Sequence, residues 1–509
     1  MSMGGVVRRN NIRIKKLACV FVVAVICMFC LVMLSSCSLD DSRTKNFTNY
    51  SLSLQFDTST KVLHGVEKVD YINSYDVPLS EVWFHLYPNA FRSNAKYKPV
   101  SSLTYDKAYS NGFSQGQIDI KSVVTSKPQN INIGGNDENI LIVKLDDELF
   151  PDERVNIEIE FNSLLPNCNH RYGYGENTYN FGNFYPIACV YEDGSFRQDN
   201  YVSSGDPFYS QMANYDVTIV CDSGFKLACT GEQTSTKSQD NITQTCVSAN
   251  HVRDFAFVLS TNYQIVSTKT KNTTIMYYYY DDENAQKSLS TAVDAINTFS
   301  NLFGEYPYPT FSVAKTNFVH GGMEYPNLVY ISDDVKDYDE YLNVIVHETA
   351  HQWWYNLVGS DAVNNAWQDE GLTEYSTLLF YKNNKGYNIV PQESLNASLS
   401  SYLLFSEIYE SVYGSFDSKM TKNVKDFSGD MDYTYVTYVK GVLFFDSLQD
   451  LIGEKNFLKG LKLYFKQNEY KIASVDDMIA CFELASKRNL KSFFDSWLDG
   501  KVILQDYNR

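Results

Sequence analysis

The chain reads YLNVIVHETAHQWWYNLVG from Tyr341 to Gly359, and this stretch decides how the second half of the molecule folds. Its apolar residues recur at helical spacing and Gly359 suits a helix C-cap, so the sequence predicts a helix over 341–358. His347 and His351 lie four positions apart, which places them about 40° apart around that helix. Both imidazoles therefore leave the same face and can meet one Zn²⁺.

A catalytic zinc usually takes three protein ligands, so a third ligand is expected nearby. Eighteen residues separate His351 from Glu370, which lies in the stretch AWQDEGLTEYSTLLFYKNNKG, residues 366–386. This stretch predicts a second helix that begins near Asn365 and ends at Gly386. A helix, a loop and a helix over this span allow Glu370 to face the two imidazoles, which predicts one zinc per chain.

Two further carboxylates accompany the predicted ligands. Glu348 lies beside the His pair and is the expected general base. Glu374, one turn after Glu370, is placed to hydrogen-bond the second ring nitrogen of a ligand His, although an acid at such a position is as often merely solvated. A helix whose His residues only fill or edge a core is the alternative to a metal site.

The chain divides into a strand-rich half and a helical half, so it predicts an α+β protein. Period-two alternation up to about residue 265 predicts half-buried strands, in the segments SLSLQFD (51–57), VNIEIEFN (155–162), YDVTIVC (215–221) and DFAFVLS (254–260). From about residue 280 the spacing becomes helical, first in residues 288–304 and then in the metal stretch, and three more helical stretches follow it. The expected organisation is a leader over 1–37, a linker over 38–48, an antiparallel β domain over 49–268 and a helical domain over 269–509.

The N-terminus resembles an export signal. Five basic residues precede the apolar run LACVFVVAVICMFCLVML, residues 17–34, and Ser35-Ser36-Cys37 follows it. A small residue before a Cys at the end of such a run resembles a bacterial lipoprotein box, which predicts lipidation at Cys37. An uncleaved membrane anchor is the alternative. Both interpretations predict a protein at the cell membrane with its domains on the extracytoplasmic face.

Composition excludes several classes of protein. Lys and Arg total 43 against 61 Asp and Glu, and the formal net charge of −18 argues against a nucleic-acid partner. Charged residues at 20% and hydrophobic residues at 44% fit a globular chain. The six cysteines beyond the leader show no CxxC spacing, so they do not predict a metal site, although Cys229 and Cys246 could form a cross-strand bridge.

Three ordered motifs together resemble the zinc aminopeptidases related to aminopeptidase N and leukotriene hydrolase. The first is H-E-x-x-H, eighteen residues, then Glu. The second is the family's G-x-M-E-N strand, which this chain matches as Gly321-Gly322-Met323-Glu324-Tyr325, with Tyr325 in place of Asn. The third is Y-x-K-G, which stands here as Tyr438-Val439-Lys440-Gly441.

The resemblance implies a saddle-like β domain followed by a thermolysin-like catalytic domain. It also implies that Tyr438 donates a hydrogen bond to the oxyanion of the substrate and that Glu324 receives the substrate's free ammonium. The backbone of the strand Gly321 to Met323 is then expected to bind the peptide. A second group from the β domain usually shares the ammonium, and Glu192 and Gln198 are the candidates.

The resemblance predicts a zinc aminopeptidase that hydrolyses the N-terminal residue of peptides through a metal-activated water. Two other functions stay open at this point. A zinc endopeptidase would use the same metal site, and a surface binding lipoprotein would carry the same fold without activity.

Overall fold

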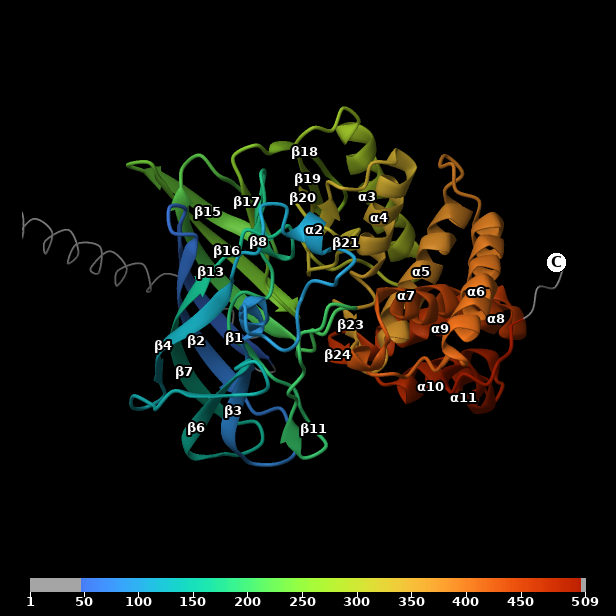
Figure 1. Ribbon diagram of the computed structural model, residues 1–509, viewed down its shortest axis with the longest axis horizontal. Coiled ribbons are helices and arrows are strands. Elements are labelled where there is room, and N and C mark those ends of the chain that lie inside the picture. The colour runs from blue at the N-terminus through green and yellow to red at the C-terminus, as the bar shows by residue number, and fades with distance from the viewer. Residues whose placement is uncertain (1–46, 505–509) are drawn as a thin grey trace, which may run out of the picture. The chain divides into compact units, whose positions relative to one another are not determined.

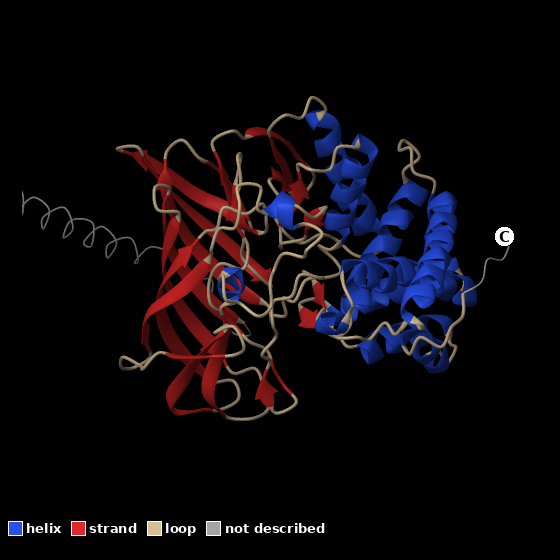
Figure 2. Cartoon of the chain, in the orientation of Figure 1, coloured by secondary structure: helices blue, strands red, loops and turns tan. Residues whose placement is uncertain are grey.

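The computed structural model describes residues 47–504. The apolar stretch 17–34, Cys37 and most of the expected linker lie outside the described residues. Figure 1 labels the elements along the chain, and Figure 2 shows the strands of the first half gathered together and the helices of the second half beside them. Both halves belong to one compact unit that begins at Phe47.

A seven-stranded sheet organises the first half, and its first strand shows why these segments form strands. In β1, Tyr50, Leu52, Leu54 and Phe56 are buried while the residues between them are exposed, because successive side chains of a strand point to opposite faces. The sheet has the order β15-β16-β13-β1-β2-β7-β4. Its strands are β1 (Thr48–Asp57), β2 (Val62–Ile72), β4 (Gln117–Val124), β7 (Arg154–Leu164), β13 (Ala213–Asp222), β15 (Glu232–Gln239) and β16 (Ile242–Val252).

Three smaller sheets complete this half. Their orders are β10-β3-β6-β5, β14-β17-β9-β8 and β11-β12. Their strands are β3 (Leu79–His85), β5 (Asn132–Gly134), β6 (Ile140–Leu149), β8 (Tyr172–Tyr174), β9 (Tyr179–Phe181), β10 (Ile187–Ala188), β11 (Tyr191–Glu192), β12 (Ser195–Phe196), β14 (Lys226–Cys229) and β17 (Phe257–Ser260), with the short helices η1 (Tyr87–Phe91) and α2 (Tyr105–Ala108) between them.

A five-stranded mixed sheet begins the second half, in the order β18-β19-β20-β22-β21. Its strands are β18 (Gln264–Lys269), β19 (Thr274–Tyr279), β20 (Thr310–Thr316), β21 (Gly322–Met323) and β22 (Leu328–Ser332). β18 pairs with β19, so residues just before the boundary expected at 268/269 already belong to this sheet. β21 is an edge strand, paired on one side only with β22.

Helices make up most of the remaining chain. They are α3 (Ala285–Leu302), α4 (Tyr338–Ala350), α5 (Ala366–Asn383), α6 (Pro391–Tyr413), α7 (Asp430–Thr434), α8 (Lys440–Ile452), α9 (Glu454–Asn468), α10 (Val475–Ser486) and α11 (Lys491–Leu498), with the short η2 (Val424–Asp426), the π-helix η3 (Tyr435–Val439) and a two-stranded pair of β23 (Val358–Gly359) and β24 (Lys471–Ile472). Three further helical stretches were expected after the metal stretch, but seven α-helices, α5 to α11, follow it in the described part of the chain.

The helix of the metal stretch is shorter than expected. α4 ends at Ala350, whereas the pattern predicted a helix as far as Gly359. Beyond it the backbone makes wider turns, in which the N–H of Asn356 donates to the carbonyl of His351 at 3.1 Å. Gly359 is not a helix cap but pairs with Ile472 in the β23–β24 ladder, so tertiary pairing ends the helix early.

Two other expectations concern cysteines and membranes. Cys229 lies in β14 and Cys246 in β16, which belong to different sheets, and both thiols are free. The bridge between them is therefore not formed. Within residues 47–504, none of the helices combines the length and the apolar character needed to cross a membrane.

Candidate metal centre and cleft

The three predicted metal ligands come together from two helices. α4 carries His347 and His351, and α5 carries Glu370. His351 Nε2 lies 3.1 Å from His347 Nε2 and 3.1 Å from Glu370 Oε2, and His347 Nε2 lies 3.3 Å from the same oxygen. Ligands about 2.0–2.1 Å from a tetrahedral zinc stand roughly 3.3 Å apart, so the three side chains fit this ion.

Both imidazoles are oriented through their other ring nitrogen. His351 Nδ1 lies 2.8 Å from Asp369 Oδ1 and 3.2 Å from the carbonyl oxygen of Trp354. His347 Nδ1 lies 3.2 Å from Glu374 Oε1, where Glu374 was expected. Such partners hold the tautomer in which Nε2 is free to bind a metal.

Glu348 reaches the cleft from the buried face of α4. Its Oε2 is buried and has no hydrogen-bond partner in the described structure, and burial raises the pKa of the carboxyl to about 7. A Cβ on Gly322 would stand 2.2 Å from Glu348 Oε1. Only glycine therefore lets β21 approach this carboxylate so closely.

Glu324 follows β21 and is enclosed. It is 3% exposed, its Oε1 has no hydrogen-bond partner among the described residues, and burial raises its pKa well above the usual range. Met323 is fully buried, so only its backbone can face the cleft. Tyr325, which replaces the family's Asn, turns into the β half, where its hydroxyl donates to Asn183 Oδ1 at 2.7 Å.

Asp206 is a site residue that the sequence did not reveal. It lines the cleft with its neighbour Arg171, to which it is ion-paired. Carboxylate oxygens of Asp206, Glu324 and Glu370 all lie within 4.8 Å of one another. Glu192 and Gln198, the two residues expected to share the substrate's ammonium, lie elsewhere. The carboxylate of Glu192 accepts hydrogen bonds from Arg197 and Tyr209, and Gln198 is exposed.

Tyr438 stands over the metal ligands from the π-helix η3. Its ring stacks on His347 with centroids 6.1 Å apart and planes at 22°. Two glycines let its helix come near, because a Cβ on Gly441 would stand 2.7 Å from the Cα of Gly371, the residue after Glu370. Lys440 points away into the core, where its ammonium donates to the carbonyls of Ser418 and Trp497.

A cleft of about 540 Å³ lies beside these groups, between the two halves of the molecule. Gly321, Gly322, Glu348 and Tyr438 all border it, together with His347 and Glu374. His320 borders it as well, but it is not among the residues whose atoms cluster as metal ligands in the described structure. The cleft thus combines a buried three-ligand set, an unpaired carboxylate and a phenol.

Comparison with known proteins agrees with this geometry. Residues 287–497 match the model of the peptidase family M1 domain. The chain is 31% identical over 225 residues to a leucine aminopeptidase 2 of Ajellomyces capsulatus, an alignment that covers 43% of this chain and 33% of that protein. It is 25% identical over 257 residues to aminopeptidase N of Lactococcus lactis, covering 45% of this chain and 29% of that protein. The alignments thus span about a third of the length of these curated relatives.

The similarity of fold extends over almost the whole chain. An M1 zinc metallopeptidase of Deinococcus radiodurans superimposes with a TM-score of 0.63 at 15% identity, over 91% of this chain and 96% of that chain. A mutant of the same protein bound to a Tyr-Ser-Ala substrate gives 0.62 at 14% identity. The expected α+β architecture, a sheet-rich half followed by a helical half, is therefore confirmed. Residues 287–497, which match the peptidase family M1 domain, lie within the second of these halves.

Proposed function

We propose that this chain is a zinc-dependent aminopeptidase, which removes the N-terminal residue from peptides. The observation that carries the proposal is Glu324, a carboxylate that is 3% exposed and has an unpaired oxygen beside the metal ligands. Burial by itself favours the protonated form of this carboxyl, and a cation placed beside it restores the carboxylate; the free ammonium of a peptide is such a cation, at the correct end of the substrate. The relatives named as aminopeptidases support the same conclusion.

The ammonium would be held by two carboxylates. Asp206 and Glu324 have carboxylate oxygens within 4.8 Å of each other, and an oxygen of Glu370 lies within the same distance of both. Asp206 keeps its place through the ion pair with Arg171. Because Glu324 is buried, the substrate enters with its N-terminus first, and only the first peptide bond reaches the metal ligands.

The peptide backbone has a partner in β21. This strand is at the edge of its sheet and pairs only with β22, so its other side is free to receive an extended peptide. The strand leads directly into Glu324. A peptide bound along it would therefore place its ammonium at the carboxylates and its first carbonyl between Glu348 and Tyr438.

The chemistry follows from the position of each side chain. A zinc ion held by His347, His351 and Glu370 would supply a Lewis acid that lowers the pKa of water and polarises the scissile carbonyl. Glu348 accepts the proton of the attacking water and passes it to the leaving amine. The Tyr438 hydroxyl donates a hydrogen bond to the oxyanion as it forms.

We also infer that the protein is anchored at the extracytoplasmic face of the cell membrane. The support is the sequence alone, because the basic residues before the apolar run 17–34 and the small residues before Cys37 have the pattern of a lipoprotein signal. Mass spectrometry of the N-terminal peptide of the membrane-extracted protein tests this. A diacylglyceryl group on Cys37 is expected, and an unmodified peptide that still contains residues 17–34 would contradict lipidation.

Aminoacyl chromogenic amides with and without an N-terminal acetyl group test the activity. The wild-type protein should hydrolyse only the free amines and should lose activity in chelator. Glu348→Ala should be inactive although it binds zinc. Glu324→Gln should raise KM for the free amines about tenfold or more, because the charge opposite the ammonium is removed.

Two results would contradict this proposal. Equal hydrolysis of acetylated and free substrates would indicate an endopeptidase. A protein that binds zinc but hydrolyses none of the free amines would have another function.

A further inference from the structure

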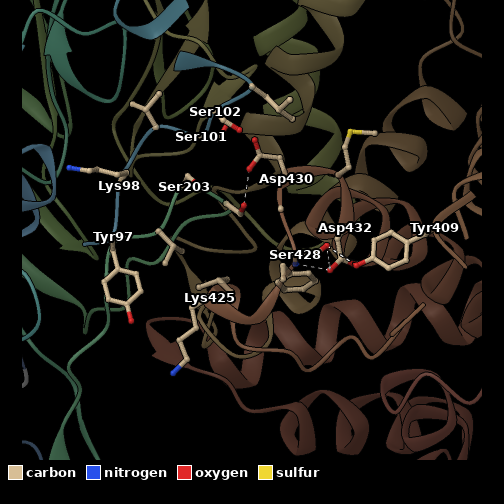
Figure 3. Close-up of a pocket in the computed structure, with 18 of the residues that line it drawn as sticks. Tyr97, Lys98, Ser101, Ser102, Ser203, Tyr409, Lys425, Ser428, Asp430 and Asp432 are labelled. Carbon is tan, nitrogen blue, oxygen red and sulfur yellow. Dashed lines mark hydrogen bonds between the residues drawn. The ribbon is translucent and has the colours of Figure 1, made fainter. Parts of the chain in front are cut away.

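A second cavity of about 770 Å³ adjoins the catalytic cleft. One wall is the segment 96–103 of the β half, and the other is formed by α6 and the segment 424–432 (Figure 3). Four residues border both this cavity and the cleft: Leu103, Ser203, Ser204 and Asp430. The two spaces are therefore neighbours that meet at these residues.

A hydrogen bond crosses the junction of the two spaces. Ser204 Oγ donates to Asp430 Oδ1 at 2.8 Å and so joins the β half to α7. Gly205 follows with a φ of +75°, and a Cβ there would stand 2.7 Å from the ring of Tyr433. This turn directs the next residue, Asp206, into the cleft, so a substrate whose ammonium lies at Asp206 has its next residues near this junction.

The floor of the second cavity is apolar. α6 presents Ile408, Val412 and Tyr413 to it, and these side chains are 53%, 65% and 71% exposed. Leu103 on the facing wall is 70% exposed. Apolar side chains gathered in this way at the mouth of a cleft mark a binding surface.

The rim of this cavity is basic, although the chain carries a net charge of −18. Lys96, Lys98 and Lys425 border it. Lys98 donates to the carbonyls of Arg92 and Ser93, while Lys96 and Lys425 have no acidic partner among the described ion pairs. In Figure 3 Asp430 and Ser102 lie at one end of the cavity and Lys425 with Tyr97 at the other, so Lys425 stands away from the junction.

Two acids line this cavity, and both lie away from its basic rim or are paired. Asp432 is ion-paired with Lys422 at 3.2 Å, and Asp430 lies at the junction with the cleft. The catalytic cleft, in contrast, is bordered by Glu340 and Glu374. A negatively charged group is therefore repelled along the cleft and attracted at the far end of the second cavity.

We propose that this cavity receives the C-terminal part of a short peptide, with apolar side chains on α6 and the terminal carboxylate near Lys96 and Lys425. The inference rests on the proposed function, because it takes the substrate's ammonium to be at Glu324. That end is closed, so the rest of the peptide has to leave through the open side of the cleft. The preferred substrates are thus oligopeptides with apolar residues and a free C-terminus.

A ladder of peptides tests this inference. Peptides of two to six residues, apolar after the first position, are made with a C-terminal carboxylate and with a C-terminal amide. In the wild type the ratio of kcat/KM, carboxylate to amide, should rise with length to about two- to fivefold, the range of a surface ion pair. The ratio should fall to one in 1 M NaCl, because salt screens such a pair over about 3 Å.

Matched variants assign the effect to the cavity. Lys96→Met combined with Lys425→Met should bring the ratio to one at every length. Lys237→Met, on β15 and outside the cavity, should leave it unchanged. An equal rate for carboxylates and amides at every length, or a ratio that survives the double substitution, overturns the inference.

The aminoacyl chromogenic amides separate this outcome from failure of the proposed function. They are too short to reach Lys425, so the wild type, the double variant and the Lys237→Met control should hydrolyse them equally. If the wild type leaves them intact, the proposed function fails. If it hydrolyses them but shows no preference in the ladder, only the second cavity is excluded as a substrate site.

Discussion

The hydroxyl of Tyr438 is the one polar atom on a ring that otherwise packs against His347 and Tyr433. Tyr438→Phe removes this atom and preserves both ring contacts. We expect kcat to fall about 10²- to 10³-fold with little change in KM, because the hydrogen bond to the oxyanion exists only in the transition state. Steady-state kinetics measures both constants, and thermal unfolding serves as the control for folding. A kcat within threefold of the wild type would assign this role to another group.

Spacing predicted the candidate metal ligands but not all of their hydrogen-bond partners. Two His four apart on a helix must share a face, whatever the rest of the chain does, so His347 and His351 could be assigned from sequence. Asp369 was missed although a ligand His usually bonds a carboxylate, because α5 offers three carboxylates, namely Asp369, Glu370 and Glu374, and only the packed helices decide which His each one meets. Asp206 could not be found because it comes from an irregular loop.

The crossing of α5 and α8 sets the distance between Glu370, a predicted metal ligand, and Tyr438, the proposed oxyanion donor. Gly371 and Gly441 touch at this crossing, and each would place a Cβ within 2.8 Å of the other's Cα. Gly441→Ala forces the helices apart, so we expect a loss of about 1–3 kcal/mol in the free energy of unfolding. The kcat should fall as well, because Glu370 and Tyr438 lie on opposite sides of the contact.

Denaturant unfolding and steady-state kinetics on the same preparation measure the two effects. Gly386→Ala is the matched control, since a Cβ there meets nothing within 4 Å. If Gly441→Ala has the stability and kcat of the control, the contact does not position Tyr438.

The end of α4 shows where local pattern stops being informative. The apolar run continues through Trp353 and Trp354, so periodicity alone gave no reason to end the helix at Ala350. Tertiary bonds end it, since the Arg253 guanidinium, buried in the β half, donates to the carbonyl of Tyr355 at 2.7 Å. The start of α5 at Ala366 and the capping box of Ser474 and Asp477 are local features, and they agreed with the sequence.

The stability of the whole molecule should depend on one buried acid of the β half. Asp254 is 1% exposed, and burial raises its pKa to about 7. Its value in the unfolded chain is about 3.9, so the folded state holds the proton more tightly. This contribution is fully present below about pH 4 and is lost as the pH rises towards 7, at about 1.4 kcal/mol per pH unit.

Asp254→Asn should therefore lose stability less steeply between pH 4 and 7 than the wild type. Urea unfolding at each pH measures the slope. Asp193→Asn, at an exposed turn, is the control and should keep the wild-type slope. Equal slopes for Asp254→Asn and the wild type would contradict a raised pKa of Asp254 in the folded protein.

The position of β1 in the seven-stranded sheet has a consequence for the order of folding. It is a central strand, and its parallel partner β13 begins at residue 213, so Thr48 pairs with Ala213 and Gln55 with Val220. At about 5–20 residues per second, a ribosome releases β13 roughly 10–30 s after β1. Through that interval the edge of β1 that β13 will cover stays open beside its hairpin partner β2, so we expect the nascent chain to need a chaperone until residue 222 has emerged.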